Sequence, residues 1–278
     1  MARQIRTQQQ LVENEVRQAI GEFLRENADE NDTVMLEPLG YIGYFSGLRT
    51  YDFPGMSSPE MVAARKLVGR DGRRLLGFLR PDWAVMRPHE INHLQLNNDW
   101  RVEHAYEWVE TFSNLEKIEA SAVQGKNYLL HDATFFLFKR REAKATAENN
   151  WTAISDYGVN EIDVGIERLI SVHAESEVKF SIPAGSRSLS LDFAFQGGSD
   201  QGEYATDGVA FGIDIRDLPT VVPIAFFEMN PANDGFRISK QYAIPEGISD
   251  DAVLRVVVDS IVWKDADRAL LSSPEFSS

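Results

Sequence analysis

The stretch TVMLEPLGYIGYFSGLRTYDF, residues 33–53, decides the fold of the first half of the chain. It begins and ends with short apolar segments of the strand type. The glycine-containing piece between them has room for a turn and a short helix. A strand, a helix and a second strand in close succession are typical of a layered α/β sheet.

The residues on either side continue this alternation. Val12, Val16 and Ile20 recur at helical spacing, which predicts an amphipathic helix within residues 1–28. Ser58 is expected to cap another helix, with a proline in its first turn. Further strands are expected at residues 82–86, 114–123 and 131–141. Together these segments predict an α/β layered sheet domain over residues 29–142.

The pattern changes in the second half of the chain. Residues 143–150 are polar and rich in alanine, which predicts a linker. Beyond it SLSLDFAF, residues 188–195, alternates apolar and polar positions with the period of two that marks a strand. About eight segments of strand type occur there without a helix between them. Residues 151–278 are therefore expected to form an all-β sandwich of the jelly-roll type.

Composition and charge exclude several classes of protein. The chain has 28 basic and 43 acidic residues and a formal net charge of −15, so no nucleic acid partner is expected, because phosphate binding needs a basic surface. It has no cysteine, which excludes disulfides and cysteine zinc sites. No apolar run is long enough to span a membrane, and the polar N-terminus does not have the form of a signal peptide. A fragment of a longer protein is expected to begin in this way.

The segment RPHEINHL, residues 87–94, contains the pattern His-Glu-x-x-His. On a helix, His89 and His93 would share a face and could hold zinc, with Glu90 as general base. However, the pattern follows a strand and a proline directly, and Asn97 and Asn98 are expected to end the helix soon after. These surroundings favour an accidental match, and a zinc-dependent hydrolase remains the second alternative function.

Three segments of the first half carry a resemblance to a known family. They are EPLGYIGYFSGLRTYDFPGMSSPE at residues 37–60, RPDWAVM at 80–86 and TFFLFKRRE at 134–142. In this order they resemble the C-terminal extracytoplasmic region of GT-C-type polytopic membrane glycosyltransferases, similar to dolichyl-phosphate-mannose mannosyltransferases and lipid A arabinosyltransferases. The resemblance covers about residues 3–142 and implies that residues 1–28 form a helix leading from a membrane region.

The resemblance implies a role but no activity for this chain alone. The catalytic carboxylate of these transferases lies in a loop between early membrane helices, and no such region is present in this sequence. The chain would then be a soluble, extracytoplasmic accessory region of a membrane-embedded transferase, and it would help to bind a glycan or a lipid-linked sugar. A stand-alone carbohydrate-binding protein is the first alternative.

Polar residues near the first two strands are candidates for a ligand-binding cleft, because α/β sheets bind ligands at their strand ends. The candidates are Glu37, Tyr41, Tyr44, Arg49 and Asp52. A purely structural role is the favoured alternative: the two tyrosines would pack against the sheet, and Asp52 would cap the following turn. The intervening glycines form neither a dinucleotide-binding motif nor a P-loop.

The second half offers candidates for sugar and metal binding. Exposed aromatic rings could stack on a sugar, although most aromatic rings in sandwiches belong to the core; the candidates are Trp151, Tyr204, Phe236 and Tyr242. The loop GGSDQGEYATDG carries Asp200, Glu203 and Asp207, oxygen ligands that suit calcium, although a solvated acidic loop is the favoured alternative. No cofactor is firmly implied.

Overall fold

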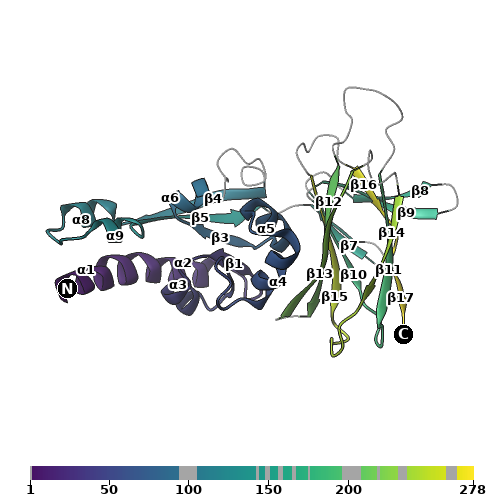
Figure 1. Cartoon of the computed structure of the whole chain (residues 1–278), viewed down its shortest axis with the longest axis horizontal. Helices are drawn as coiled ribbons and strands as arrows, with labels where there is room; N and C mark the ends of the chain where they lie inside the picture. Colours follow the sequence, from purple (N-terminus) through teal and green to yellow (C-terminus); the bar gives the residue numbers. More distant parts are fainter. Residues whose placement is uncertain are drawn as a thin grey trace, which may run out of the picture. The chain divides into compact units, whose positions relative to one another are not determined.

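The chain divides into two compact units, Met1–Arg141 and Glu142–Ser278 (Figure 1). The computed structural model describes residues 2–93, 105–141, 144–147, 151–155, 159–164, 167–174, 176–195, 208–217, 220–230, 237–260 and 268–278. No helix in these ranges is long and apolar enough to cross a bilayer.

The first unit begins with a continuous helical run of three segments, α1 (Ala2–Thr7), η1 (Gln8–Arg17) and α2 (Gln18–Asn27). The middle segment has the wider π-helical winding, in which residues five apart are neighbours. Accordingly, Gln9 donates a 3.0 Å hydrogen bond to Asn14. The apolar residues at helical spacing are buried, as the sequence predicted. Val16 and Ile20 pack against the strands of the sheet, whereas Val12 belongs to a smaller cluster with Ile118.

A five-stranded mixed sheet forms the centre of this unit, in the order β2-β1-β3-β5-β4. Strands β1 (Thr33–Leu36), β2 (Arg49–Asp52) and β3 (Trp83–Met86) are parallel. Strand β5 (Thr134–Arg140) is antiparallel to β3, and the edge strand β4 (Tyr106–Ser113) is antiparallel to β5. All residues of β1 and β3 are buried, as expected for strands covered on both faces.

Short helices connect the strands. They are α3 (Leu39–Ser46), α4 (Pro59–Val68), α5 (Gly72–Leu79), α6 (Pro88–His93), α8 (Leu115–Ala120) and α9 (Asn127–Leu130). The expected cap of α4 is present, because Met61 N donates to Ser58 Oγ at 3.2 Å. The strand expected at residues 114–123 was wrong: that segment contains α8, and β4 pairs with β5 instead.

The second unit is a sandwich of two antiparallel sheets. One has the order β13-β12-β15-β10-β7-β6, and the other has the order β14-β11-β16-β9-β8, with β17 also paired to β11. The strands are β6 (Lys144–Ala147), β7 (Trp151–Ser155), β8 (Val159–Val164), β9 (Glu167–His173), β10 (Ser176–Ser181), β11 (Ser188–Phe195), β12 (Val209–Asp217), β13 (Thr220–Met229), β14 (Arg237–Ala243), β15 (Val253–Ser260), β16 (Arg268–Leu271) and β17 (Glu275–Ser277).

The alternation read from the sequence sets the two faces of these sheets. Along β11 every second residue is buried, and these residues join the core between the sheets. This confirms an α/β domain followed by an all-β sandwich. The expected linker is partly ordered into the sandwich, because β6 lies at residues 144–147 and pairs with β7.

Candidate functional site

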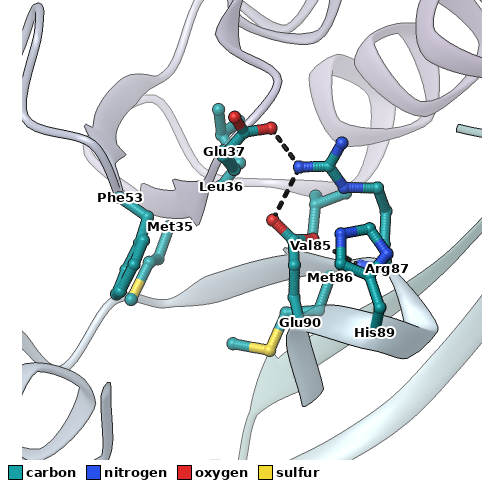
Figure 2. Close-up of a pocket in the computed structure, with 9 residues that line it drawn as sticks. All are labelled: Met35, Leu36, Glu37, Phe53, Val85, Met86, Arg87, His89 and Glu90. Carbon is teal, nitrogen blue, oxygen red and sulfur yellow. Dashed lines mark hydrogen bonds and ion pairs between the residues drawn. The ribbon is translucent and has the colours of Figure 1, made fainter. Parts of the chain in front are cut away.

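A pocket of about 210 Å³ lies at the carboxyl ends of β1 and β3 (Figure 2). Parallel strands bring the residues that follow them to one edge of the sheet, which is where α/β sheets usually bind ligands. The pocket is lined by Met35, Leu36, Glu37, Phe53, Val85, Met86, Arg87, His89 and Glu90.

Apolar and polar side chains occupy different parts of the pocket. Figure 2 shows Met35 and Phe53 together on one side, whereas Glu37, Arg87 and Glu90 converge on the other. The main chain brings Phe53 to this edge, since Phe53 N donates to Leu36 O at 2.7 Å. The pocket therefore offers an apolar wall that faces charged hydrogen-bonding groups.

Arg87 organises the polar side. Its guanidinium forms ion pairs with Glu37, with Glu90 at 2.9 Å and with Asp132 at 2.6 Å. Asp132 in turn binds Arg17 of the N-terminal helix at 2.8 Å. Burial by itself would lower the pKa of Arg87, but the three carboxylates outweigh it and raise this pKa, so the guanidinium stays charged. This arrangement fixes Arg87 at the pocket edge.

Glu90 is occupied by the start of its own helix. One of its oxygens accepts a 2.7 Å bond from Arg87 N, and the other accepts from the Arg87 guanidinium. This resembles a capping box, in which a glutamate in the first turn binds the backbone N–H of the capping residue. Glu37 is more available to a ligand, because 37% of its side chain is exposed. In the described structure Arg87 donates to its Oε2 and leaves its Oε1 without a bond from Arg87.

The His-Glu-x-x-His pattern therefore has a structural explanation in the described residues. Glu90 caps α6, and the exposed ring of His89 contacts the ring of His131 edge-on, with 5.3 Å between the centroids. The side chain of His93 lies outside the described part of the chain. No group of three potential metal ligands occurs among the described residues.

The structure separates the five predicted cleft residues, and of these only Glu37 lines the pocket. Asp52 is 1% exposed and accepts hydrogen bonds from Met56 N at 2.6 Å and from Ser57 N at 3.1 Å, so it caps the following turn. Arg49 pairs with the largely buried Glu60.

The two tyrosines of α3 lie elsewhere on the surface. The Tyr41 hydroxyl accepts a 2.5 Å bond from Gln9 Nε2. Tyr44 is 82% exposed, so it does not pack against the sheet as its structural alternative expected. Sequence reasoning missed Arg87, His131 and Asp132. For Arg87 a signal existed, because it is a charged residue directly after a fully buried strand.

The candidate residues of the sandwich have different fates. Trp151 is 2% exposed and belongs to the core, with its Nε1 donating to Glu161 at 2.9 Å, so it is not an exposed sugar platform. Tyr242 is partly buried against the core. The other candidates, Tyr204, Phe236, Asp200, Glu203 and Asp207, lie outside the described residues.

Comparison with known protein families assigns the chain to one family. Residues 3–159 match the family described as Domain of unknown function (DUF8728), which is more than half of the 278-residue chain. The chain belongs to this family. The DUF8728 match includes every residue that lines the strand-end pocket and extends into the first strands of the sandwich. No curated protein matches the sequence.

Among solved structures, the chain is similar to CBM51-2 in complex with GlcNAc and INT domains from Clostridium perfringens ZmpB, with 15% identity over 52% of this chain and 34% of that chain and a TM-score of 0.34. It is similar to CBM51 from Clostridium perfringens GH95 in complex with methyl-galactose, with 12% identity over 49% of this chain and 94% of that chain and a TM-score of 0.30. The chain spans about a third or less of the ZmpB structures that it matches. TM-scores this low carry no argument about ligand or activity.

Proposed function

We propose that this chain is a non-catalytic accessory region of a GT-C-like membrane glycosyltransferase, and that it recognises a saccharide through the strand-end pocket. The observation that carries the proposal is the pairing of an available carboxylate, Glu37, with an apolar wall that includes Met35 and Phe53. Such a pocket offers two different surfaces to a ligand at once.

A sugar ring matches this division. Its C–H groups can lie against apolar side chains, and its hydroxyls can donate hydrogen bonds to a carboxylate. Glu37 is the acceptor, and the exposed His89 at the rim adds a second polar partner. The pocket volume of about 210 Å³ is below the roughly 300–1,000 Å³ of pockets for drug-sized ligands, so a single sugar ring is the suitable occupant.

A binding role also agrees with the state of the other acidic groups. Both oxygens of Glu90 are engaged by Arg87, and Asp132 bridges Arg87 and Arg17. Acid–base catalysis needs a group that can exchange a proton with the substrate. Carboxylates held in these ion pairs are better suited to keeping the pocket in shape.

One end of the α/β unit supports a position next to a membrane. The start of α1 lies beside α8 and α9 (Figure 1), and a Cβ at Gly125 would be 3.6 Å from Gln4. This end exposes Ile5 by 61% and Tyr128 by 60%, next to the basic residue Lys126. Exposed apolar and aromatic side chains with lysine and arginine are typical of surfaces that lie at a membrane interface.

The test is a titration of the purified chain with the methyl glycosides of glucose, galactose, mannose and arabinose, followed by NMR. We expect at least one glycoside to shift the amides of residues 35–37, 86, 87, 89 and 90. Glu37→Gln should weaken that binding about tenfold, because it removes a charged hydrogen-bond acceptor. Glu116→Gln, an exposed carboxylate elsewhere in the same unit, is the matched control and should bind as wild type.

Two results would contradict the proposal. Either none of the four glycosides shifts the pocket amides, or Glu37→Gln binds with unchanged affinity. A hydrophobic multi-span segment encoded directly upstream of residue 1 would separate the accessory region from the first alternative, a stand-alone carbohydrate-binding protein. One tightly bound zinc that is lost in His89→Ala would instead favour the hydrolase.

A further inference from the structure

A break in one strand ladder opens a second hollow, on the sandwich. Strand β11 pairs with β16 at residues 193–195 and with β17 at residues 188–190. Between these two pairings the chain passes through Ser272 and Pro274, and proline cannot donate to a ladder. Ser272 maintains the contact by exchanging bonds with the main chain of Asp192, at 2.9 Å to its N and 3.0 Å to its O.

The hollow has a volume of about 300 Å³, and its lining includes Arg168, Ser190, Asp192, Arg237, Ser272 and Glu275. Alternation along β11 directs Leu189 and Leu191 into the core, so Ser190 and Asp192 lie on the opposite face of the sheet.

The charges that line this hollow are balanced, because two arginines lie with two carboxylates. Asp192 pairs with Arg237 of the neighbouring strand β14, and hydrogen bonds from Arg237 and Ser239 lower the pKa of Asp192. Arg168 pairs with Glu161 at 3.1 Å. Glu275 supplies a further carboxylate at the start of β17. The hollow therefore presents charged donors and charged acceptors together with serine hydroxyls, which can act as either.

We infer that this hollow is a second saccharide-binding site, which takes a neutral, polyhydroxylated ligand. Sugar hydroxyls both donate and accept, so they can bind Arg237, Ser190 and Glu275 together without breaking the Asp192–Arg237 pair. An anionic ligand would have to compete with Asp192 for Arg237. The described residues that line the hollow include no aromatic ring, so affinity comes from hydrogen bonds and is weak. The site is separate from the strand-end pocket and does not depend on it.

The experiment uses the full chain and three probes, lactose, cellobiose and maltose, each titrated to tens of millimolar and followed by NMR. We expect at least one disaccharide to shift the amides of residues 190–192, 272, 273 and 275. Glu275→Gln should weaken this binding about tenfold, because Glu275 is exposed and its carboxylate is a charged acceptor. Ser190→Phe should abolish it by filling the hollow.

Thr152→Phe is the matched control, because it places the same ring at an exposed strand position of the other sheet. It should bind the disaccharide as wild type does. Unfolding temperatures of all variants identify any loss through misfolding, and Glu275→Gln keeps the test valid if Ser190→Phe is unstable.

The proposal is overturned if no disaccharide shifts these amides, or if Glu275→Gln binds as wild type. Shifts confined to residues 35–37 and 86–90 would overturn this second site and leave the strand-end pocket intact. Shifts confined to the hollow, with no shift of the strand-end amides by any glycoside, would support this second site and refute sugar binding in the strand-end pocket.

Discussion

Replacement of Arg255 should destabilise the sandwich strongly, because it would remove the fully buried cation that two buried carboxylates share. The cations that remain are less buried: Lys179 lies 2.8 Å from Glu177, and Arg216 lies 3.7 Å from Asp214. Arg255 is 0% exposed. Its Nε lies 2.9 Å from each carboxylate oxygen of Asp214, and its Nη1 lies 3.1 Å from Glu177. Asp214 and Glu177 are 1% and 2% exposed and come from the strands on either side of β15. The three charges thus cross three adjacent strands.

The magnitude follows from this burial. Arg255→Met keeps much of the side-chain volume and removes the charge, and removal of one partner from a buried ion pair costs about 3–5 kcal/mol. For a unit of this size, 1 kcal/mol corresponds to roughly 3–4 °C in unfolding temperature. We therefore expect the unfolding transition of the sandwich to fall by roughly 10–20 °C.

Calorimetry of the variant measures this shift, with two controls. Arg216→Met removes a cation that lies 3.7 Å from Asp214; the Arg216 side chain is 18% exposed. This substitution should lower the free energy of unfolding by no more than about 1 kcal/mol. The triple variant Arg255→Met, Asp214→Leu, Glu177→Leu should recover most of the stability, because it removes the buried charges together. If Arg255→Met melts within about 3 °C of wild type, water reaches these carboxylates and the reasoning fails.

Three further predictions concern other parts of the chain. Burial would raise the pKa of Asp82, but the charge and hydrogen bond of Arg140 and the bonds from Thr33 outweigh it and lower this pKa. The stabilisation of the folded state by ionised Asp82 is therefore complete above the ordinary pKa of about 4 and is lost as pH falls through the lower folded value. Asp82→Asn should reduce the unfolding temperature at pH 7 and make it depend less on acid pH. Unfolding temperatures of variant and wild type that fall in parallel with pH would contradict this. Gly21→Ala would place a Cβ 2.7 Å from Phe45 Cβ and 3.0 Å from a main-chain oxygen of α3. Urea unfolding should therefore show that the free energy of unfolding falls by about 1–3 kcal/mol. A stabilised variant would refute the close approach of α2 and α3. The Tyr242 hydroxyl is buried with no hydrogen-bond partner in the described structure, and burial raises its pKa to about 12. Tyr242→Phe should leave the free energy of unfolding unchanged or raise it by up to about 1 kcal/mol. A loss of disaccharide binding in this variant would show that Tyr242 contacts the sugar.

The strength of the local pattern explains which elements the sequence predicted. The cap at Ser58 and the alternation of residues 188–195 were correct because each depends on neighbours a few residues away. Residues 114–123 were assigned to the wrong element because a short apolar and charged segment fits both periods. Its position beside the N-terminal helix decided the outcome, since Ile118 packs with Val12 in a small core that the sequence does not reveal.

The strand-end pocket shows the same division. Glu37 was predicted from the rule that ligands bind at strand ends. The ion pairs of Arg87 join residues that are 45 and 50 positions apart, and no local pattern encodes such separations. Arg49 and Asp52 were grouped with Glu37 because all three lie in the segment of residues 33–53. In the structure Arg49 is held by Glu60, and Asp52 is held by the turn at residues 56–57.

By itself, the sequence determined the α/β-then-β order of the two units, the buried face of each periodic segment and the negative charge of the chain, because these depend on composition and on periods of two or 3.6 residues. Only the tertiary structure decided which polar groups share a site. Glu90 became the cap of α6, Trp151 became part of the core, and Ser190 and Glu275 came to line one hollow. The physical reason is that ion pairs and pockets depend on distances across strands, and chain folding sets these distances between residues that are far apart in the sequence.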